Sequence, residues 1–268
     1  MNQSPPAGSV RDHVQSLERG LSVLKAFSAE QPELTLSEVA RHCDLPRSAA
    51  RRFLLTLVDL GYVGVDGRNF YLRSQVLELG YTYLSSMRLP DVARRPLVQL
   101  SADLQRSTSV AVLDRDDVVY VIRIAAKRIL AAGIGVGTRL PAYLTSHGRV
   151  LLAALPDAEL DAYLARVVLE PRAPKTVSTL DALRREIELA RQQGWSLVDE
   201  ELEEGVSSVA TALRDAGGGV VASVNVAVYA GAGAGAGLIA LALQPLLATA
   251  AAIEEHLRLA QTSVGGRR

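Results

Sequence analysis

The stretch TLSEVARHCDLPRSAARRFLLTLVDLGYVGVDGRNFYL, residues 35–72, decides the fold of the first part of this chain. Thr35 and Glu38 have the spacing of a capping box, in which each side chain bonds to the backbone amide of the other residue. A helix is therefore predicted to begin at Leu36. Pro46 fits the first turn of a second helix, because the amide hydrogen that proline lacks would have no partner there.

The second helix is predicted to begin at Arg47 and to be amphipathic. At a period of 3.6 residues its apolar positions share one side. These positions are Ala50, Phe53, Leu54, Leu57 and Leu60. The opposite side carries the hydroxyl and guanidinium groups of Ser48, Arg51, Arg52 and Thr56. Gly61 suits a left-handed cap at the end of this helix.

A β-hairpin is predicted after the second helix. Asp66-Gly67 separates the apolar run Tyr62-Val63 from Phe70–Leu72, and this dipeptide favours a two-residue type I′ turn. Two short helices, a tight turn and a hairpin in this order predict a winged helix-turn-helix. Folds of this kind place their second helix in the major groove of DNA.

Double-stranded DNA is therefore the first partner to consider. Arginine pairs with guanine through two hydrogen bonds, and small hydroxyl groups contact bases or phosphates. We expect DNA contacts from Thr35, Ser37, Arg47, Ser48, Arg51, Arg52, Thr56 and Arg68. The alternative is an ordinary solvated helix surface. Because residues 1–73 carry nearly equal numbers of basic and acidic side chains, affinity is expected to depend on a few arginines and on two copies of the unit.

Composition limits what the rest of the chain can be. Its 268 residues leave room for a second domain, and zero net charge with 49% hydrophobic residues is typical of a globular protein with a buried core. The single cysteine, Cys43, excludes a disulfide framework and a multi-cysteine metal site, so we expect a cytoplasmic protein. Residues 1–12 hold no apolar segment, which predicts a disordered leader and no secretory signal.

An uncharged run from Ala216 to Ile253 raises the alternative of a membrane span. Its first part alternates as a strand does, and the run GAGAGAG then interrupts it. Leu238–Ile253 is shorter than the roughly 20 residues that a spanning helix needs. We therefore expect a buried strand followed by a core or interface helix, and no membrane partner.

Helices are predicted on both sides of the winged unit. Residues 16–27 carry one apolar stripe that is expected to support the unit; it comprises Leu17, Leu21, Leu24 and Phe27. Residues 74–87 are apolar on two sides, so this helix is expected to link two domains and to pack against a second subunit. Leu89-Pro90 is expected to end it.

Beyond residue 90 helices and strands alternate. Helices are predicted at 91–106, 145–155, 157–166, 180–193 and 238–260, and strands at 109–113, 118–124, 129–134, 195–198, 206–213 and 219–228. Because short turns join neighbouring strands, we expect an α+β domain with an antiparallel sheet flanked by helices. The predicted division is a leader (1–12), a winged unit (13–73), a linker helix (74–90), a second domain (91–262) and a disordered tail (263–268).

Several stretches together are distinctive: SLERGLSVLKAF, LPRSAARRFLLTLVDLGY, DGRNFYL, GTRLPAYLTSHGRVLLAAL, GWSLVDEELEEGVSSVA and VVASVNVAVYA. Through them the chain resembles the IclR family of bacterial transcription regulators over nearly its full length. LPRSAARR, LPAYLTSHGR and VNV are most similar to the branch that controls catabolism of protocatechuate, 4-hydroxybenzoate and β-ketoadipate. The resemblance implies a linker helix, a C-terminal effector domain of GAF-like fold, and a homodimer or a dimer of dimers.

Position by position, the resemblance implies an effector site formed by Tyr143, Ser146, His147, Gly148, Asp199, Glu200, Val206, Ser208, Asn225 and Ala227. A small carboxylic acid fits, because free amides at a helix start near Ser146 bind anions. Each polar group could instead make only local bonds, Ser146 as a cap, Asn225 within the sheet and Asp199 in a turn. Arg123 and Arg139 are either further carboxylate partners or ordinary ion pairs.

Two positions depart from the family pattern. Ser207 stands where many relatives carry arginine, and His147 occupies a variable position, so no relative's ligand transfers directly to this chain. An enzyme is the competing class, since Gly231, Gly233 and Ala236 imitate a dinucleotide-binding loop. No strand follows to complete the βαβ unit, and the histidines lack metal-site or triad spacing. We expect no catalytic residue, metal or cofactor.

The sequence therefore predicts a DNA-binding regulator that binds a pseudo-palindromic operator and responds to a small aromatic or keto carboxylic acid. Control of aromatic-acid catabolism is the expected role. Two alternatives stay open: a regulator of the same family that senses a non-aromatic metabolite such as a 2-keto acid, and a DNA-binding protein whose C-terminal domain only oligomerises. Repression and activation are both compatible with these residues.

Overall fold

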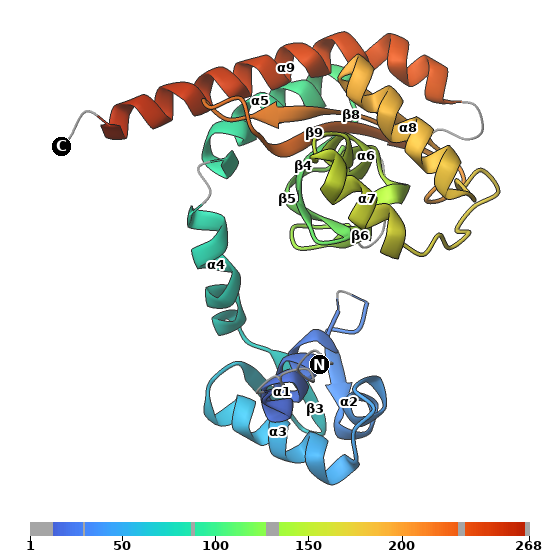
Figure 1. Ribbon diagram of the computed structural model, residues 1–268. Coiled ribbons are helices and arrows are strands. Elements are labelled where there is room, and N and C mark those ends of the chain that lie inside the picture. Colours follow the sequence, from blue (N-terminus) through green and yellow to red (C-terminus); the bar gives the residue numbers. More distant parts are fainter. Residues whose placement is uncertain (1–12, 29, 87–88, 127–133, 230–233, 266–268) are drawn as a thin grey trace, which may run out of the picture. The chain divides into compact units, whose positions relative to one another are not determined.

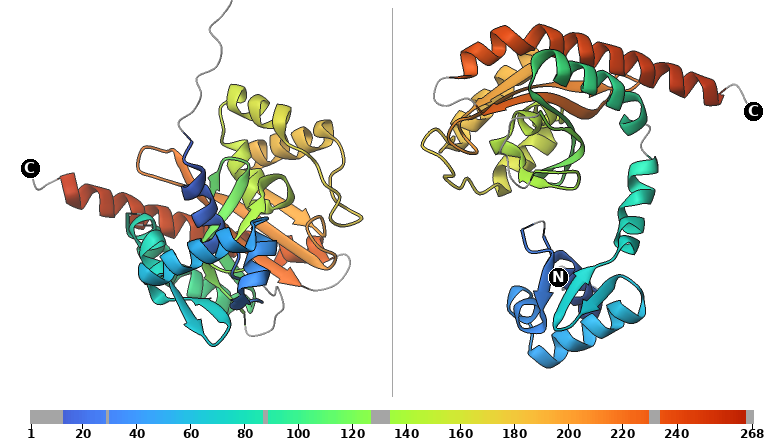
Figure 2. Two further views of the ribbon diagram at one scale, coloured as in Figure 1. Left: turned by 90° about the horizontal axis from the view of Figure 1, so that it is seen from below. Right: turned by 180° about the vertical axis from the view of Figure 1, so that it is seen from behind.

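The computed structural model describes residues 13–28, 30–86, 89–126, 134–229 and 234–265 (Figure 1). The chain divides into two compact units, Met1–Tyr83 and Leu84–Arg268, and Figure 2 shows each of them from two further directions. The expected leader at 1–12 lies outside the described residues. Of the expected tail, residues 263–265 are helical, and the rest is outside the described part.

The first unit contains three helices and a three-stranded antiparallel sheet in the order β1-β3-β2. Its elements are α1 (Gln15–Lys25), β1 (Glu33–Thr35), α2 (Leu36–His42), α3 (Arg47–Asp59), β2 (Val63–Asp66) and β3 (Asn69–Leu72). The winged helix-turn-helix is thus confirmed. Strand β1 was not predicted, because three residues are too few to show a periodic pattern.

Local side-chain bonds explain where the helices of this unit begin and end. The Thr35 amide donates to Glu38 Oε2 at 2.8 Å, and the Glu38 amide donates to Thr35 Oγ1 at 3.4 Å. The predicted capping box is therefore confirmed at the start of α2. Pro46 immediately precedes α3, and Gly61 takes a left-handed φ of 83° after it, as predicted.

The hairpin is confirmed, but the predicted turn type is wrong. Asp66 pairs with Asn69, so the two turn residues are Gly67 and Arg68 rather than Asp66 and Gly67. A type I′ turn needs a positive φ at both central positions. Only Gly67, at 57°, meets that requirement, and a single positive φ at the first position is the pattern of a type II′ turn.

The hydrophobic core of the first unit differs from the prediction at two places. Leu60 is exposed, because α3 ends at Asp59 and the chain turns away there. Of the predicted stripe, Leu24 and Phe27, which follows α1, pack inward together with Val23, whereas Leu17 and Leu21 are 63% and 44% exposed. Only the C-terminal half of the predicted stripe therefore enters the core.

The helix after the wing is exposed on all sides. It consists of a single 3₁₀ turn, Ser74–Val76, followed by α4 (Leu77–Ser86). Its apolar side chains Leu77, Leu79, Tyr81 and Tyr83 all lie at the surface of the described chain. The next helix, α5, begins at Leu89, so Pro90 stands in its first turn and does not merely end the helix before it.

The second unit contains a six-stranded antiparallel sheet in the order β6-β5-β4-β9-β8-β7. Its strands are β4 (Ser107–Asp114), β5 (Asp117–Ile124), β6 (Arg139–Pro141), β7 (Trp195–Asp199), β8 (Val206–Arg214) and β9 (Val220–Tyr229). Its helices are α5 (Leu89–Leu104), the 3₁₀ turn η2 (Ala142–Leu144), α6 (Ser146–Ala153), α7 (Asp157–Arg166), α8 (Leu180–Gln193) and α9 (Ala234–Gly265). The predicted α+β class is confirmed.

The sheet separates two hydrophobic cores. Helices α5 and α9 cover one face (Figure 1), where they pack on valines and leucines of β4, β8 and β9. Helices α6, α7 and α8 share the core on the other face with Ala111, Val118 and Tyr120. Strand β9 shows the division residue by residue, since Ala222, Val224 and Val226 enter only the core beneath α9.

Two predicted elements of this unit changed. Most of the strand expected at 129–134 falls outside the described residues, and Ile134 itself is not in a strand. Strand β6 was not predicted. Helix α9 begins at Ala234, inside the glycine-alanine run that was expected to separate the last strand from the last helix.

Helix α9 is also longer than predicted. Its segment Gly235–Leu259 is long and apolar enough to cross a membrane by length and composition. A core helix of a globular protein has the same properties, and one side of α9 is buried in the core of the sheet. The buried side consists of Leu238, Ala242, Leu246, Ala250, Ile253 and Leu257. These contacts support the predicted core helix, although the predicted length was wrong.

Candidate DNA-binding surface and effector site

The outer side of α3 carries the residues that we predicted to contact DNA. Arg47, Ser48, Arg51, Arg52 and Thr56 are all exposed, while Ala50, Leu54 and Leu57 on the opposite side are buried. None of these arginines forms an ion pair or side-chain hydrogen bond with another described residue. Three guanidinium groups are therefore available on one helix, and α2 and the hairpin support that helix from behind.

The remaining predicted DNA contacts differ in their local bonds. Arg68 is exposed in the hairpin turn, and Ser37 is exposed on α2. Thr35 is engaged locally, because its hydroxyl donates to Glu38 Oε2 at 2.7 Å. Hydrogen bonds from Thr35 also lower the pKa of Glu38. The structure thus gives Thr35 a clear capping role and leaves Arg68 and Ser37 free to contact a partner.

A group of buried polar side chains, with the partly buried Ser208, lies between the sheet and α6. We call it the polar cluster; it comprises Ser109, Ser146, His147, Ser208, Ser223 and Asn225. Ser109 and Asn225 pair across β4 and β9, so they share one face of the sheet. Predicted residues Ser146, His147, Ser208 and Asn225 are therefore brought together. Ser109 and Ser223 were missed, because serines that alternate with valines in a strand look like an ordinary solvent-facing pattern.

The hydrogen bonds of the polar cluster have a definite direction. The Ser109 hydroxyl donates to Asn225 Oδ1 at 2.6 Å, so its oxygen must accept from His147 Nε2, 3.1 Å away. His147 Nδ1 then accepts from the Ser223 hydroxyl at 2.6 Å. Complete burial lowers the pKa of His147 to about 3, although the Asn225 side chain acts in the opposite direction. The imidazole is therefore neutral at physiological pH.

One end of the cluster remains available to a ligand. The Asn225 amide nitrogen has no hydrogen bond to any described residue, and it is not among the sealed, unpaired buried atoms. At the start of α6, Thr145 caps the helix by accepting from the Gly148 amide at 2.9 Å. The amides of Ser146 and His147 precede that bond, where helix amides have no partner within the helix. The Asn225 amide and the Ser146 and His147 amides are therefore available to donate to a small polar ligand.

Gly148 contributes no polar side chain; it allows the start of α6 to pack closely against η2. A Cβ atom at this position would lie 2.0 Å from the carbonyl oxygen of Ala142. Any larger residue would therefore push the start of α6 away from η2. Beside it, fully buried Arg149 is bonded to Glu201 at 2.5 Å and to the carbonyl oxygen of Tyr143 at 3.3 Å. This buried ion pair fixes α6 and was not predicted.

The structure separates Asp199 and Glu200 from the polar cluster. Asp199 pairs with Ser207, and Ser207 pairs with Val228, whose side chain packs beneath α9. Asp199 therefore faces α9, where the Ser207 hydroxyl, at 2.5 Å, and Lys175 lower its pKa. Glu200, with a left-handed φ of 60°, also binds Lys175, at 2.8 Å. Both carboxylates have structural partners. Val206 and Ala227, in contrast, lie on the α6 face through their register.

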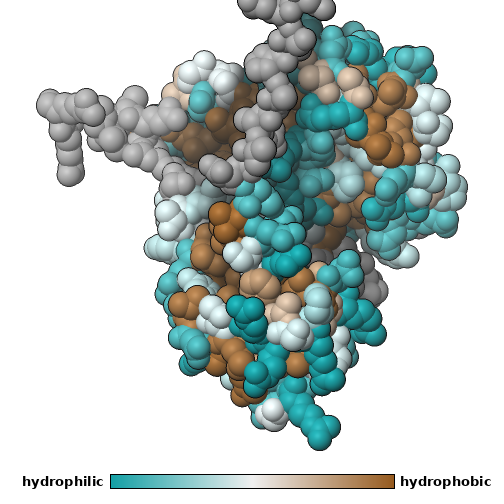
Figure 3. Space-filling view, turned by 60° about the horizontal axis from the view of Figure 1, so that its bottom comes forward, coloured by the Kyte–Doolittle hydropathy of each residue, from teal (hydrophilic) through white to brown (hydrophobic). Residues whose placement is uncertain are grey.

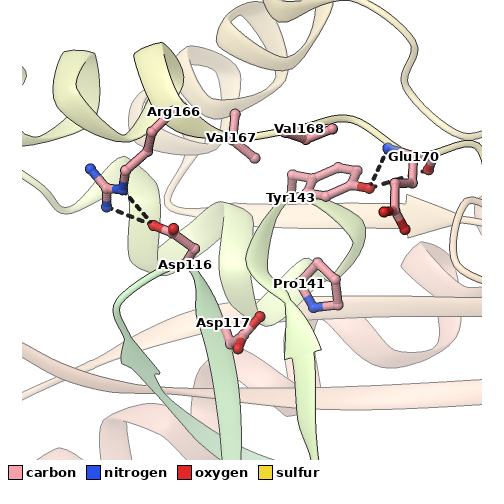
Figure 4. A pocket seen from close by; sticks show the side chains of 8 residues that line it. All are labelled: Asp116, Asp117, Pro141, Tyr143, Arg166, Val167, Val168 and Glu170. Atoms are coloured by element: carbon pink, nitrogen blue, oxygen red, sulfur yellow. Dashed lines mark hydrogen bonds and ion pairs between the residues drawn. The ribbon is translucent and has the colours of Figure 1, made fainter. Parts of the chain in front are cut away.

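The hydroxyl of Tyr143 also points away from the polar cluster. It accepts from the Glu170 amide at 2.8 Å and donates to the Glu170 carbonyl at 3.2 Å (Figure 4). Tyr143 lines a hollow of about 300 Å³ together with Asp116, Asp117, Pro141, Arg166, Val167, Val168 and Glu170. Arg166 and Asp116 form an ion pair at 2.6 Å across this hollow. Its charged groups are thus already paired.

A winged helix-turn-helix with unpaired arginines on α3, followed by an α+β unit, has the organisation of a DNA-binding transcription regulator. No cluster of His, Cys, Asp and Glu able to hold a metal ion occurs among the described residues. Residues 16–67 match the IclR helix-turn-helix domain, and residues 81–255 match the C-terminal domain of bacterial transcriptional regulator IclR. The chain belongs to the IclR family of transcription regulators.

Similar proteins narrow the branch of the family. The Pca regulon regulatory protein of Pseudomonas putida is 42% identical over 82% of this chain and 76% of its own length. A solved structure from Rhodococcus sp. RHA1, proposed to be a transcriptional regulator, is 46% identical with a TM-score of 0.79, covering 91% of this chain and 98% of that one. An IclR homologue from Microbacterium hydrocarbonoxydans, complexed with 4-hydroxybenzoate, is 25% identical with a TM-score of 0.79, covering 90% and 98%.

Proposed function

We propose that this protein binds a pseudo-palindromic operator through α3 and responds to a small aromatic carboxylic acid, so that it controls aromatic-acid catabolism. The observation that carries the proposal is the polar cluster on the α6 face, which leaves donors unpaired beside buried surface. A ligand that accepts from Asn225 and from the α6 amides would use these unpaired donors and cover the apolar surface beside them.

The chemistry of the cluster favours an acid that carries a second polar group. Amide and hydroxyl donors suit a hydroxyl or carbonyl oxygen, and Val206 and Ala227 supply small apolar contacts for a ring or chain. The Pseudomonas putida relative is named for the Pca regulon, and the Microbacterium homologue was solved with 4-hydroxybenzoate. Both relatives support an aromatic acid in preference to a short 2-keto acid.

Exposed apolar side chains support a homodimer. Val14, just before α1, forms with Leu17 and Leu21 of α1 a stripe that the unit's own core leaves uncovered, and α4 exposes apolar residues on several sides. Figure 3 shows brown hydrophobic side chains exposed among teal ones at the surface. A second copy that covers these stripes would pair two α3 helices, as a pseudo-palindromic operator requires.

Effector binding is tested with the full chain. The single tryptophan, Trp195 in β7, reports unfolding of the second unit by fluorescence. At about 100 times its dissociation constant an effector should raise the free energy of unfolding by about 2.7 kcal/mol. We expect this from 4-hydroxybenzoate or protocatechuate. Stabilisation by pyruvate or glyoxylate alone would favour the keto-acid alternative, and no stabilisation by any acid would favour a domain that only oligomerises.

DNA binding is tested at Arg51. If Arg51 reads a guanine, Arg51→Ala should weaken operator binding by about 1 to 3 kcal/mol in a gel shift. Arg19→Ala, an exposed arginine on α1 of the same unit, is the matched control and should bind normally. Equal affinity of the two variants would remove Arg51 from the interface. Linkage further requires that operator DNA change effector affinity by the same factor as effector changes operator affinity.

A further inference from the structure

Arg123 lies next to the polar cluster, although no hydrogen bond joins it to the cluster. In strand β5 it pairs directly with Ser109 of β4, and Ser109 pairs on its other side with Asn225 of β9. Directly paired residues project from the same face of a sheet. Arg123, Ser109 and Asn225 therefore form a row on the α6 face, spanning about 10 Å across two strand spacings.

The guanidinium of Arg123 has no counter-charge. It is half-buried, yet it makes no ion pair or hydrogen bond with any described residue. Burial lowers its pKa, which is the sign of a cation that lacks a compensating carboxylate. The sequence offers none nearby, because residues 118–156 contain neither aspartate nor glutamate.

Three other cations of this unit that the structure describes are engaged. Arg149 is bonded to Glu201, Lys175 to Asp199 and Glu200, and Arg139 to Asp114 and Asp117. His147, at the centre of the cluster, is neutral because of its burial. Among the described residues, Arg123 is therefore a cation of the α6 face beside the polar cluster that remains available to an anion.

We propose that Arg123 binds the carboxylate of the effector, while Asn225 and the amides at the start of α6 bind its second polar group. This inference rests on the proposed function of the same site. It adds the orientation of the bound effector and the chemical class of the effector. A planar guanidinium pairs with a carboxylate through two parallel hydrogen bonds. Helix amides and Asn225 carry no full charge, so they suit a hydroxyl or carbonyl oxygen better. The ligand class is an acid with an uncharged polar group at its far end.

The test compares an acid with its amide, which removes the charge and keeps the shape. Calorimetry on the full chain would measure 4-hydroxybenzoate against 4-hydroxybenzamide, and pyruvate against pyruvamide. Arg123→Gln should weaken binding of the acid at least tenfold and change binding of the amide little. The ratio of the affinity for the acid to the affinity for the amide measures the charge pairing with Arg123. If Arg123 had a purely structural role, the substitution would change both affinities by the same factor.

Two further variants make the result specific. Arg139→Gln removes a cation that already has two carboxylate partners and should leave the acid-to-amide ratio unchanged. Arg123→Lys keeps the charge without the planar fork and should give an intermediate ratio. Trp195 fluorescence would confirm that each variant folds. If the wild type binds none of these ligands, the proposed function fails. If the wild type binds an acid and Arg123→Gln binds it equally well, only this inference is overturned.

Discussion

The two faces of the six-stranded sheet differ in the polarity of their side chains. Beneath α5 and α9 the strands present mainly apolar side chains. The polar side chains there bond locally: Thr108 donates to the Leu97 carbonyl, Thr211 to the Gly194 carbonyl and Ser207 to Asp199. Facing α6, the same strands present Ser109, Ser223 and Asn225. Adjacent residues of β9 belong to opposite faces, so one strand contributes to both. Both faces carry a hydrophobic core. The α9 face contributes mainly to stability, whereas the polar cluster gives the α6 face the recognition role that we assign to it.

The energetics of the two faces explain this separation. Apolar surface removed from water contributes roughly 25 cal/mol per Å², with no requirement for direction. A buried hydroxyl or imidazole contributes little net free energy even when fully paired, and it costs about 1 to 3 kcal/mol when a partner is removed. The α6 face keeps an ordered chain of bonds from Ser223 through His147 and Ser109 to Asn225. Such a face gains directional donors at the expense of stability.

The largest expected effect comes from truncating the α9 face. Leu246 is completely buried in that core, and Leu246→Ala should lower the free energy of unfolding by about 2 to 5 kcal/mol. Because Leu246 lies on the far side of the sheet from the polar cluster, effector affinity of the folded variant should stay unchanged. Urea unfolding and calorimetry together would check this.

Asn225→Ala is the matched variant on the other face. It removes the acceptor of the Ser109 hydroxyl, so it should cost about 1 to 3 kcal/mol of stability and also weaken effector binding at least tenfold. A variant of Leu246 that loses effector affinity while folded, or a variant of Asn225 that keeps it, would contradict the division between the faces.

Acid should destabilise the α6 face next most strongly. Burial lowers the pKa of His147 to about 3 in the folded chain, whereas an unfolded histidine titrates near 6.5. The unfolded state therefore binds the proton more readily, and stability falls as pH falls from about 6.5 toward 3. The slope is at most roughly 1.4 kcal/mol per pH unit, or about 2 kcal/mol between pH 6.5 and pH 5.

The acid effect is measured by urea unfolding at several pH values, with Trp195 fluorescence as the signal that monitors unfolding. His147→Gln should flatten the slope between pH 5 and pH 6.5, and His256→Gln, on an exposed side of α9, should not. Asp199 does not interfere in this window, because its pKa lies below the usual value for an aspartate. An unchanged slope in His147→Gln would remove the buried imidazole as the cause.

The smallest expected effect distinguishes two glycines at the start of α9. A Cβ at Gly235 would lie 2.9 Å from the Asp199 carboxylate, whereas a Cβ at Gly237 would meet nothing within 4 Å. Gly235→Ala should lose about 1 kcal/mol by disturbing the bonds of Asp199, and Gly237→Ala should gain up to about 1 kcal/mol in helix propensity. Equal effects would show that Asp199 does not restrict the start of α9.

Local patterns predicted the elements that depend on neighbouring residues. The capping box of Thr35 and Glu38, the helix from Arg47 and the left-handed Gly61 all follow from bonds within a few residues. Predictions that depended on distant packing failed, as with the inward stripe of α1, the exposure of Leu60 and the length of α9. In the α1 stripe Leu24 and Phe27 enter the core while Leu17 and Leu21 do not, and the apolar pattern alone contained no signal for where the buried part begins.

The candidate effector site, too, could be predicted only where local sequence patterns specify it. The helix start at Ser146 and the late strand with Asn225 could be singled out from the sequence, but their shared neighbour Ser109 could not. Strand register brought Ser109 and Arg123 beside Asn225 and turned Asp199 toward α9. Register arises from pairing between strands that lie far apart in the chain, and the local alternation of one strand does not specify it.

By itself, the sequence of this protein determined two units, a winged DNA-binding fold, an α+β second domain and a place in the IclR family. These properties rest on short-range patterns and on motifs that are read directly. Only the tertiary structure decided which face of the sheet is mainly apolar, which polar groups meet on the other face, and that Arg123 has no carboxylate partner among the described residues. Those features depend on pairings across the sheet, where a shift of one residue would exchange its two faces.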